Sequence, residues 1–338
     1  MELKTLCELP GISGREEPVR MAIYNECVEK LGKENVTIDR MGNVIAHKKC
    51  ANENAKRLMI AAHMDEVGLM VISATEDGLL KVCAIGGIDS RVLVSKRVKV
   101  GYGENAISGV IGAMAIHQQT AEDRKHVLPI EQLYVDIGAK DKAEAESVAP
   151  IGTPIIFETP FTPFGDHKVL ARSLDDRVGC YTMLRLLDDE TNYDTWFAFT
   201  CQEEVGCRGA YGAAFRIQPD IGLVLEGTAS NDAGDIPEHE QVCVLGKGVA
   251  ISFMDHASIA QPEMFKTMLA VAQEAGVPHQ VKMAVTGGND GGPIQRTHIG
   301  AQTCALSVPC RYIHSPSTVC DLRDLDAQYE LVKAFLQK

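Results

Sequence analysis

The chain has 338 residues, of which 45% are hydrophobic and 23% are charged, so it can bury a large core and is long enough for two domains. Its net charge of -13 and the lack of a block of Lys and Arg argue against nucleic acid or an anionic membrane as a partner. No apolar run approaches the ~18 residues of a membrane span, and the segment Met1–Pro10 lacks the apolar core of a secretion signal. Eleven cysteines, an odd number without a CxxC pair, predict free thiols in a reducing cytoplasm rather than a disulfide framework or a structural zinc site.

Residues 1–67 predict two helices and three strands. After a short opening helix, Ser13–Glu16 fits a capping box, and the apolar residues behind it recur every four positions, as in an amphipathic helix over a sheet: Val19, Ile23, Cys27 and Leu31. Residues 36–48 are strand-like on both sides of Gly42–Asn43, which is a hairpin signal. The apolar run Leu58–Ala62 predicts an interior strand, which delivers His63–Glu66 at its end.

Residues 68–163 have a different pattern, with short β-type runs between glycine turns. The runs are 68–73, 79–85, 97–100, 107–115 and 133–137, and only 141–148 predicts a helix. This pattern is typical of a small β-barrel or sandwich inserted into another domain. Gly101–Ala106 superficially resembles a dinucleotide-binding loop, but no helical pattern follows it, so we reject that interpretation. Pro160, Pro163 and Gly165 mark the return, which predicts a discontinuous domain of residues 1–67 and 164–338 around an inserted domain of residues 68–163.

Beyond residue 164 strands and helices alternate, which predicts an α/β architecture with an apolar central sheet. The predicted strands are 169–171, 195–201, 221–225, 249–253, 280–285 and 302–308. The predicted helices are 176–187, 208–215, 262–275 and a last helix that carries Leu325, Tyr329, Val332 and Leu336.

Polar side chains follow five of the predicted strands. They are His63 and Asp65 after 58–62, Asp175–Arg177 after 169–171, Glu203–Glu204 after 195–201, Glu226 after 221–225, and His314 after 302–308. Ligands of α/β sheets gather beside the carboxyl ends of the strands. One histidine at a strand end is usually structural, and one Glu–Glu pair is usually solvated. Two histidines and several carboxylates from five strand ends indicate a metal site instead.

Five motifs make the chain resemble the M42 family of metallo-aminopeptidases, also called glutamyl aminopeptidases and often labelled cellulases or endoglucanases. The motifs are Ala62–Gly68, Leu174–Arg177, Glu203–Ala210, Gly287–Asp290 and Arg311–Pro316. Each motif is weak alone, but their order over nearly the whole chain is highly specific. The resemblance implies a zinc-peptidase-like α/β catalytic domain interrupted by a β-rich, barrel-like dimerisation domain. It also implies a two-metal site in a large self-compartmentalising homo-oligomer, typically of twelve subunits built from dimers.

The resemblance also implies a role for each site residue. Asp175 bridges the two metals, His63 and Glu226 complete one site, and Glu204 and His314 complete the other. Glu203 becomes the general base. Asp65 accepts the second ring N–H of His63, which fixes the tautomer of a metal-bound histidine. The Asp175–Asp176 peptide bond is expected to be cis, as in related peptidases.

The chain departs from the commoner family pattern at a few positions. Glu226-Gly227-Thr228 stands where many members have Asp-Val-Thr; Glu is a sound ligand with a longer reach, so metal binding is expected to survive while the metal spacing or the preferred ion changes. Asn289 stands where Thr is frequent, and Asp290 beside it receives no role. Gln118–Gln119 either reaches a neighbouring active site, as a glutamine does in the family, or lies in an exposed polar loop.

The chemistry follows from this ligand set. Two divalent ions, zinc or cobalt with manganese as a further option, lower the pKa of a shared water from 15.7 towards roughly 7 and so supply a bridging hydroxide nucleophile. Glu203 takes the water's proton and passes it to the leaving amine. No GxSxG elbow, HExxH helix or P-loop supports another hydrolase or a nucleotide enzyme.

We therefore predict a metal-dependent aminopeptidase that releases N-terminal residues from short peptides. Another two-metal amide hydrolase, such as a deacylase or a carboxypeptidase, stays open because the metal core does not identify which end of the substrate binds. A glycosidase is disfavoured because the carboxylates coincide with histidines. A non-catalytic peptide-binding shell protein is the remaining alternative, although it would be expected to lose the base or a ligand. The preferred N-terminal residue, the metal, and the choice between dimer and dodecamer stay open.

Overall fold

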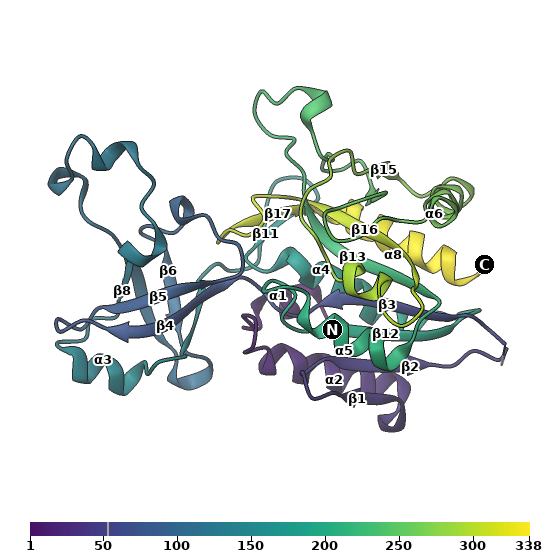
Figure 1. Cartoon of the computed structure of the whole chain (residues 1–338), viewed down its shortest axis with the longest axis horizontal. Helices are drawn as coiled ribbons and strands as arrows, with labels where there is room; N and C mark the ends of the chain where they lie inside the picture. The colour runs from purple at the N-terminus through teal and green to yellow at the C-terminus, as the bar shows by residue number, and fades with distance from the viewer. Residues whose placement is uncertain (53) are drawn as a thin grey trace.

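The computed structural model describes residues 1–52 and 54–338, and it contains a mixed sheet of eleven strands and a separate six-stranded barrel (Figure 1). The main path of the sheet is β1 (Val36–Ile38), β2 (Val44–Lys48), β12 (Asp194–Thr200), β3 (Arg57–His63), β13 (Ile221–Ala229), β16 (Gln302–Arg311), β17 (Thr318–Asp321), β11 (Lys168–Ala171) and β10 (Thr162–Pro163). Off this path, β14 (Val249–Ile251) pairs with β16 and with β15 (His279–Val281).

The centre of the sheet is parallel, and its strands end at one edge. β12, β3, β13 and β16 are parallel neighbours, whereas β17 is antiparallel to both β16 and β11, so β11 runs in the same direction as β16. β3 is buried from Leu58 to His63, as its continuous apolar run predicts. The carboxyl ends of five strands therefore face the same crevice.

Helices cover both faces of the sheet. One face packs on α1 (Leu3–Glu8), α2 (Glu17–Leu31), α4 (Leu174–Leu186), α6 (Pro262–Glu274) and α8 (Leu322–Leu336). The other face packs on α5 (Arg208–Ile217) and α7 (Gly291–Gln295). Along β3, Leu58 and Ile60 belong to the first core and Met59 to the second, which is the two-residue alternation of a strand buried on both sides.

The predicted capping box at the start of α2 is wrong. The helix begins at Glu17, and no side chain caps it. Ser13 Oγ instead donates to Asp65 Oδ2 at 2.6 Å, and the Gly14 amide donates to Glu16 Oε1 at 2.7 Å. The Ser13 hydroxyl therefore hydrogen-bonds to the buried Asp65 carboxylate and does not cap the helix.

The barrel comprises β4 (Gly68–Ala74), β5 (Leu80–Ile85), β8 (Tyr134–Asp136), β7 (Ile107–Gly112), β6 (Arg97–Val100) and β9 (Pro154–Phe157), closed in that order. It has its own apolar core, and α3 (Lys142–Val148), capped by Asp141, packs beside β4. The prediction of a barrel or sandwich is thereby resolved as a barrel, although β9 was not predicted. Residues 103–105 form a short 3-10 turn between β6 and β7, with no dinucleotide-type helix behind it.

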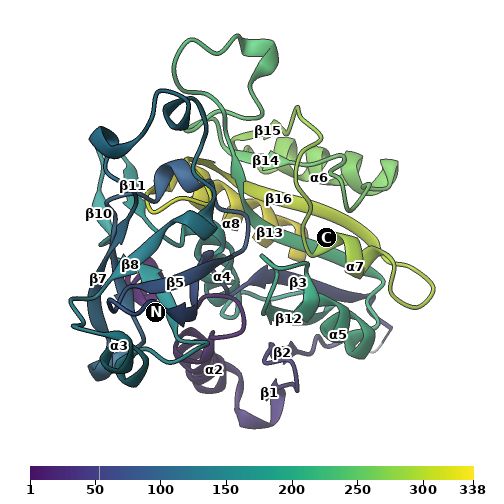
Figure 2. The same cartoon turned by 60° about the vertical axis from the view of Figure 1, so that its left-hand side comes forward.

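Both views place the β17–β11–β10 end of the sheet beside the barrel (Figures 1 and 2). At this junction Glu66, which follows β3, forms an ion pair with Arg172, and Tyr102 of the barrel accepts a hydrogen bond from the Ile12 amide at 3.0 Å. The domain boundaries at residues 67 and 164 remain proposals. Among the described residues, none of the helices combines the length and the apolarity that crossing a membrane requires.

Candidate active site

Five elements bring the predicted site residues to one cavity of about 230 Å³. His63 ends β3, Glu203–Glu204 follow β12, Glu226 lies in β13, Asp175 lies in the first turn of α4 after β11, and His314 lies in the turn between β16 and β17. The cavity wall includes His63, Asp175, Glu203, Glu226 and His314, and the Glu204 carboxylate lies against His314.

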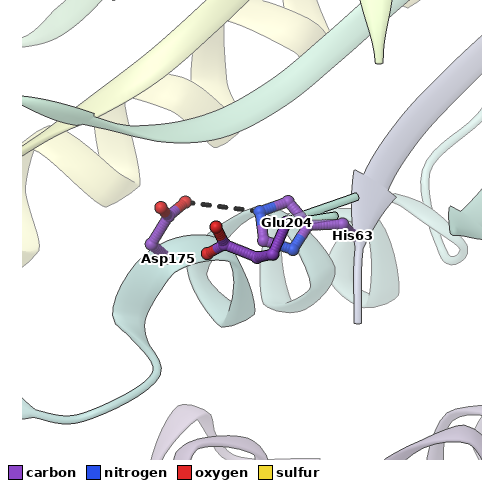
Figure 3. Close-up of side chains that lie close together, drawn as sticks. All are labelled: His63, Asp175 and Glu204. Carbon is purple, nitrogen blue, oxygen red and sulfur yellow. Dashed lines mark ion pairs between the residues drawn. The ribbon is translucent and has the colours of Figure 1, made fainter. Parts of the chain in front are cut away.

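The two oxygens of Asp175 face different histidines. His63 Nε2 lies 3.5 Å from Asp175 Oδ1 and 3.6 Å from Glu226 Oε2. His314 Nε2 lies 3.3 Å from Asp175 Oδ2 and 3.3 Å from Glu204 Oε2. Figure 3 shows His63, Asp175 and Glu204 converging from separate elements. Two adjoining sets of ligand atoms therefore share one carboxylate.

Each histidine presents the same nitrogen to this cluster. His63 Nδ1 donates to the backbone carbonyl of Asp65 at 3.0 Å, and His314 Nδ1 donates to the carbonyl of Gly87, in the barrel, at 3.1 Å. Carbonyl acceptors of this kind fix the tautomer in which Nε2 carries the free lone pair. Both rings are thus oriented as metal ligands.

The cluster lacks donors for its buried oxygens. Asp175 Oδ1, Glu204 Oε1 and Glu226 Oε1 are buried and have no hydrogen-bond partner among the described residues. Burying a carboxylate oxygen without a partner is costly, and a cation removes that cost. Two imidazoles and three carboxylates suit zinc, cobalt or manganese, so the residues present fit two divalent ions.

The electrostatics of the cluster also favour bound cations. Burial raises the pKa of Glu204 to about 7, and the neighbouring Asp175 carboxylate adds to the effect. Burial opposes the charged form of His314, but the hydrogen bond to Asp175 and the negative charges of Glu204 and Asp175 together outweigh it and raise the pKa to about 9. Without metal, the crowded carboxylates are thus balanced by protons, which divalent ions would displace.

Asp65 contacts both His63 and the Glu203–Glu204 backbone. Its carboxylate Oδ1 lies 3.6 Å from His63 Nδ1, and its backbone carbonyl is the nearer acceptor at 3.0 Å. The carboxylate instead accepts hydrogen bonds from Ser13 Oγ and from the amides of Glu203 at 3.0 Å and Glu204 at 3.2 Å. Asp65 thus contacts His63 most closely through its main chain and the Glu203–Glu204 backbone through its side chain, and the expected carboxylate–histidine hydrogen bond stays a prediction.

Glu203 borders the cluster without joining its closest contacts. Its Oε2 is 3.9 Å from His63 Nε2, and its Oε1 accepts a hydrogen bond from Cys207 Sγ at 3.2 Å. Burial, with neighbouring carboxylates such as Asp290, raises the pKa of Glu203 to about 8. The side chain is 11% exposed and lines the cavity, so solvent or substrate can reach it.

A family model for M42 glutamyl aminopeptidases matches residues 42–331. The chain belongs to this family. The lysyl aminopeptidase of Pyrococcus furiosus is 34% identical over 345 residues, which cover 99% of this chain and 96% of the relative. A solved aminopeptidase from the archaeon Desulfurococcus kamchatkensis superposes with a TM-score of 0.94 at 33% identity, covering 99% of this chain and 93% of that one. This M42 chain is accordingly a peptide hydrolase.

A further solved relative bears on assembly. The Pyrococcus horikoshii TET1 peptidase, described as assembling into a tetrahedron or a large octahedral shell, has a TM-score of 0.84 at 32% identity. The match covers 99% of this M42 chain and 98% of that one.

The structure adds detail at the departures from the family pattern. The longer Glu226 reaches within 3.6 Å of His63, and a Cβ at Gly227 would lie 3.0 Å from Asp175 Oδ1, so the glycine makes room for the shared carboxylate. Asp290 is 1% exposed, with a raised pKa of about 6 caused by burial. Gln119 donates to its own Met114 carbonyl at 2.7 Å on an exposed loop, and its reach to a neighbouring site stays a prediction.

Sequence reasoning missed Lys282 of this M42 site, and it gave Asp176 no role beyond its place in a motif and at an expected cis peptide bond. Asp176 follows Asp175 across a cis peptide bond and lies near His63 and Glu226, but its oxygens already accept from the His63 amide at 3.1 Å and the Gly179 amide at 3.0 Å. We therefore interpret Asp176 as a support for β3 rather than a metal ligand. Lys282 lines the cavity although it is only 6% exposed, and the one available signal was a charged residue inside the predicted strand 280–285.

Proposed function

We propose that this chain is a two-metal aminopeptidase that releases N-terminal residues from short peptides. The observation that carries the proposal is Asp175, whose two oxygens face His63 and His314 while one of them has no other partner. His63 and Glu226 complete one metal site with Asp175, and Glu204 and His314 complete the other. The α/β lobe is then a zinc-peptidase-like catalytic domain.

The metals and the protein divide the chemistry. Two divalent ions held by these residues, zinc or cobalt with manganese as a further option, would polarise the scissile carbonyl and lower the pKa of the attacking water. Glu203 takes the proton of that water and delivers it to the leaving amine. Asp65 keeps Glu203 in position because its carboxylate accepts a hydrogen bond from the Glu203 backbone amide. The reaction needs no covalent intermediate.

The cavity also favours one class of substrate side chain. Lys282 Nζ donates to the Thr286 carbonyl at 3.3 Å and makes no ion pair with a carboxylate in the described part of the chain. A buried cation with one weak partner gains most from a carboxylate at hydrogen-bond distance. We infer that the site prefers an acidic N-terminal residue, Glu or Asp, which agrees with the description of the family.

Metal content and substrate class test the main proposal together. Fully reconstituted protein should contain two ions per chain and hydrolyse amino-acid anilides, and chelation should abolish the activity reversibly. Hydrolysis of N-acyl amino acids with no cleavage of the anilides would make the chain a deacylase or a carboxypeptidase. One ion per fully active chain would contradict the bridging role of Asp175.

We further propose that the barrel mediates homo-oligomerisation, with dimers that assemble towards a dodecamer. The proposal is supported by the shell-forming relative and by exposed apolar side chains of the barrel loops, such as Met114 at 56% and Ile116 at 68%. Light scattering should report an oligomer, and deletion of residues 68–163 should yield smaller species. A monomer over a wide concentration range would contradict this proposal.

A further inference from the structure

A third group of possible ligands lies beside the two paired metal sites. Cys207, Glu203 and Asp290 each offer a ligand atom, and these atoms lie within 4.8 Å of one another. Cys207 precedes α5, and Asp290 precedes α7, the two helices that cover the same face of the sheet. Glu203 also lines the cavity that holds the paired sites, whereas Cys207 and Asp290 do not, so this group adjoins the paired sites and shares one residue with their cavity.

One observation places two of these ligands close together, and a second, independent one points to a cation between them. Cys207 Sγ approaches Glu203 Oε1 to 3.2 Å. Asp290 is 1% exposed, and its Oδ1 has no hydrogen-bond partner among the described residues, although its Oδ2 accepts from the Thr200 hydroxyl. A buried carboxylate oxygen without a donor calls for an explanation, and a nearby cation supplies one.

The distances and the ligand types suit a thiophilic ion. Sulfur and oxygen ligands at about 2.3 and 2.1 Å from a tetrahedral zinc ion stand roughly 3.5 Å apart, close to the observed separation of Cys207 and Glu203. Asp290 needs only a small side-chain adjustment from within 4.8 Å. Cys207 and Glu203 are partly exposed, so an ion can enter from solvent. A thiolate and two carboxylates carry three negative charges, enough to hold a third divalent cation beside the first two.

We propose that Cys207, Glu203 and Asp290 form a third metal site, which takes a thiophilic divalent ion such as zinc or cadmium and inhibits hydrolysis when it is filled. The inference rests on the proposed role of Glu203 as the proton acceptor. On binding, the Cys207 thiol releases its proton to solvent, and a sulfur–metal bond replaces its hydrogen bond to Glu203. The Glu203 carboxylate, now a ligand, no longer accepts the proton of the attacking water.

Cadmium binding to the two-metal enzyme tests this site. The wild type should take up one cadmium ion per chain beyond the two ions that it holds, develop the ultraviolet absorption of a thiolate–cadmium bond, and lose activity in parallel. Cys207→Ser keeps a hydroxyl that can donate to Glu203 but removes the soft ligand. It should lose the absorption, and its uptake and inhibition should require at least about tenfold more cadmium, since even outer partners of a metal site are worth 10–100-fold in affinity.

The matched control is Cys83→Ser, which removes another partly exposed thiol, in the barrel, and should behave as the wild type does. Each variant's inhibition is expressed relative to its own rate without cadmium. Equal uptake and equal inhibition of the wild type and Cys207→Ser would overturn the proposal, because the inhibitory ion would then occupy the His63 and His314 sites. Near-normal turnover of Glu203→Gln would reject Glu203 as the general base. The cadmium absorption of the wild type would still report metal binding at Cys207, so the two failures can be told apart.

Discussion

The two lobes use their buried volume differently. The barrel strands, residues 68–157, bury only apolar side chains, from Leu69 to Phe157, and no charged or polar side chain among them is buried. The α/β lobe buries carboxylates, arginines and the histidine His63 at the ends of its strands. Apolar burial stabilises without requiring partners, whereas each buried charge needs a partner or a cation. The buried charges that the proposed chemistry uses therefore lie in one lobe, and the other lobe contributes a main-chain acceptor, the Gly87 carbonyl.

The largest expected effect lies in the α/β lobe. Glu203→Gln keeps the size of the side chain but cannot accept a proton, so the turnover number should fall by about 10² to 10⁴ while both metals stay bound. Glu204→Gln is the matched control, because it should lose metal from one site and regain activity in excess ion. Measuring metal content and rate for both variants decides between the roles. If Glu203→Gln loses a metal and Glu204→Gln keeps both, then Glu203 is the metal ligand and Glu204 is the base.

A barrel substitution should affect stability and leave the chemistry intact. Leu80 is fully buried, so Leu80→Ala should lower the free energy of unfolding by about 2 to 5 kcal/mol. Urea denaturation measures this change, and the turnover number per folded chain should stay within about twofold. Ile72→Ala, at a barrel position that is 46% exposed, should cost under about 0.5 kcal/mol. A large loss of turnover in folded Leu80→Ala would show that packing of the barrel core also affects the chemistry of the α/β lobe.

Selectivity should depend on one buried cation of the α/β lobe. Lys282→Gln should reduce kcat/KM for glutamyl anilide relative to leucyl anilide by roughly 10- to 100-fold, since a hydrogen bond to a charged group is worth about 1.5 to 3 kcal/mol. Lys266→Gln, on the exposed side of α6, is the control and should leave the ratio unchanged. An unchanged ratio in Lys282→Gln would place the selectivity elsewhere.

The smallest expected effect is a dependence of stability on pH. Burial opposes the charged form of Asp232, but two hydrogen bonds from Arg311, at 2.7 and 2.9 Å, together with those from the Leu245 amide and the Ser230 hydroxyl, outweigh it and lower the pKa of Asp232. The folded state thus binds this proton less tightly, so the stabilisation is present above about pH 4 and is lost as the pH falls through the lower, folded pKa.

Asp232→Asn should remove this slope, which is worth under about 1 kcal/mol. The control is Asp89→Asn, which removes the partner of Arg91 in an exposed barrel pair, where solvent and salt screen the attraction, and it should leave the slope unchanged. Acid titration of the unfolding free energy measures both variants. An identical slope for Asp232→Asn and the wild type would show that other groups dominate below pH 4.

The sequence predicted the elements that have strong periodicity and the residues at their ends. The β3 run Leu58–Ala62 and the glycine-separated strands of the barrel have patterns that only one type of element satisfies. Short elements such as β17 and β10 were missed, although β6 and β11 of similar length were predicted, because two to four residues carry little periodicity. The contacts of Asp65 were also beyond the sequence, since its main chain and its side chain both carry acceptors and only the folded geometry selects between them.

The hydrogen bond from His314 to the Gly87 carbonyl joins the two lobes at the proposed metal site. The insertion also leaves the sheet shortly after His63 and returns shortly before Asp175. A neighbour that holds the barrel still would therefore also hold these ligands still, and by thermodynamic linkage ion binding would strengthen the contact with that neighbour by the same factor. Metal affinity and subunit affinity in this chain would then be linked by a single coupling free energy.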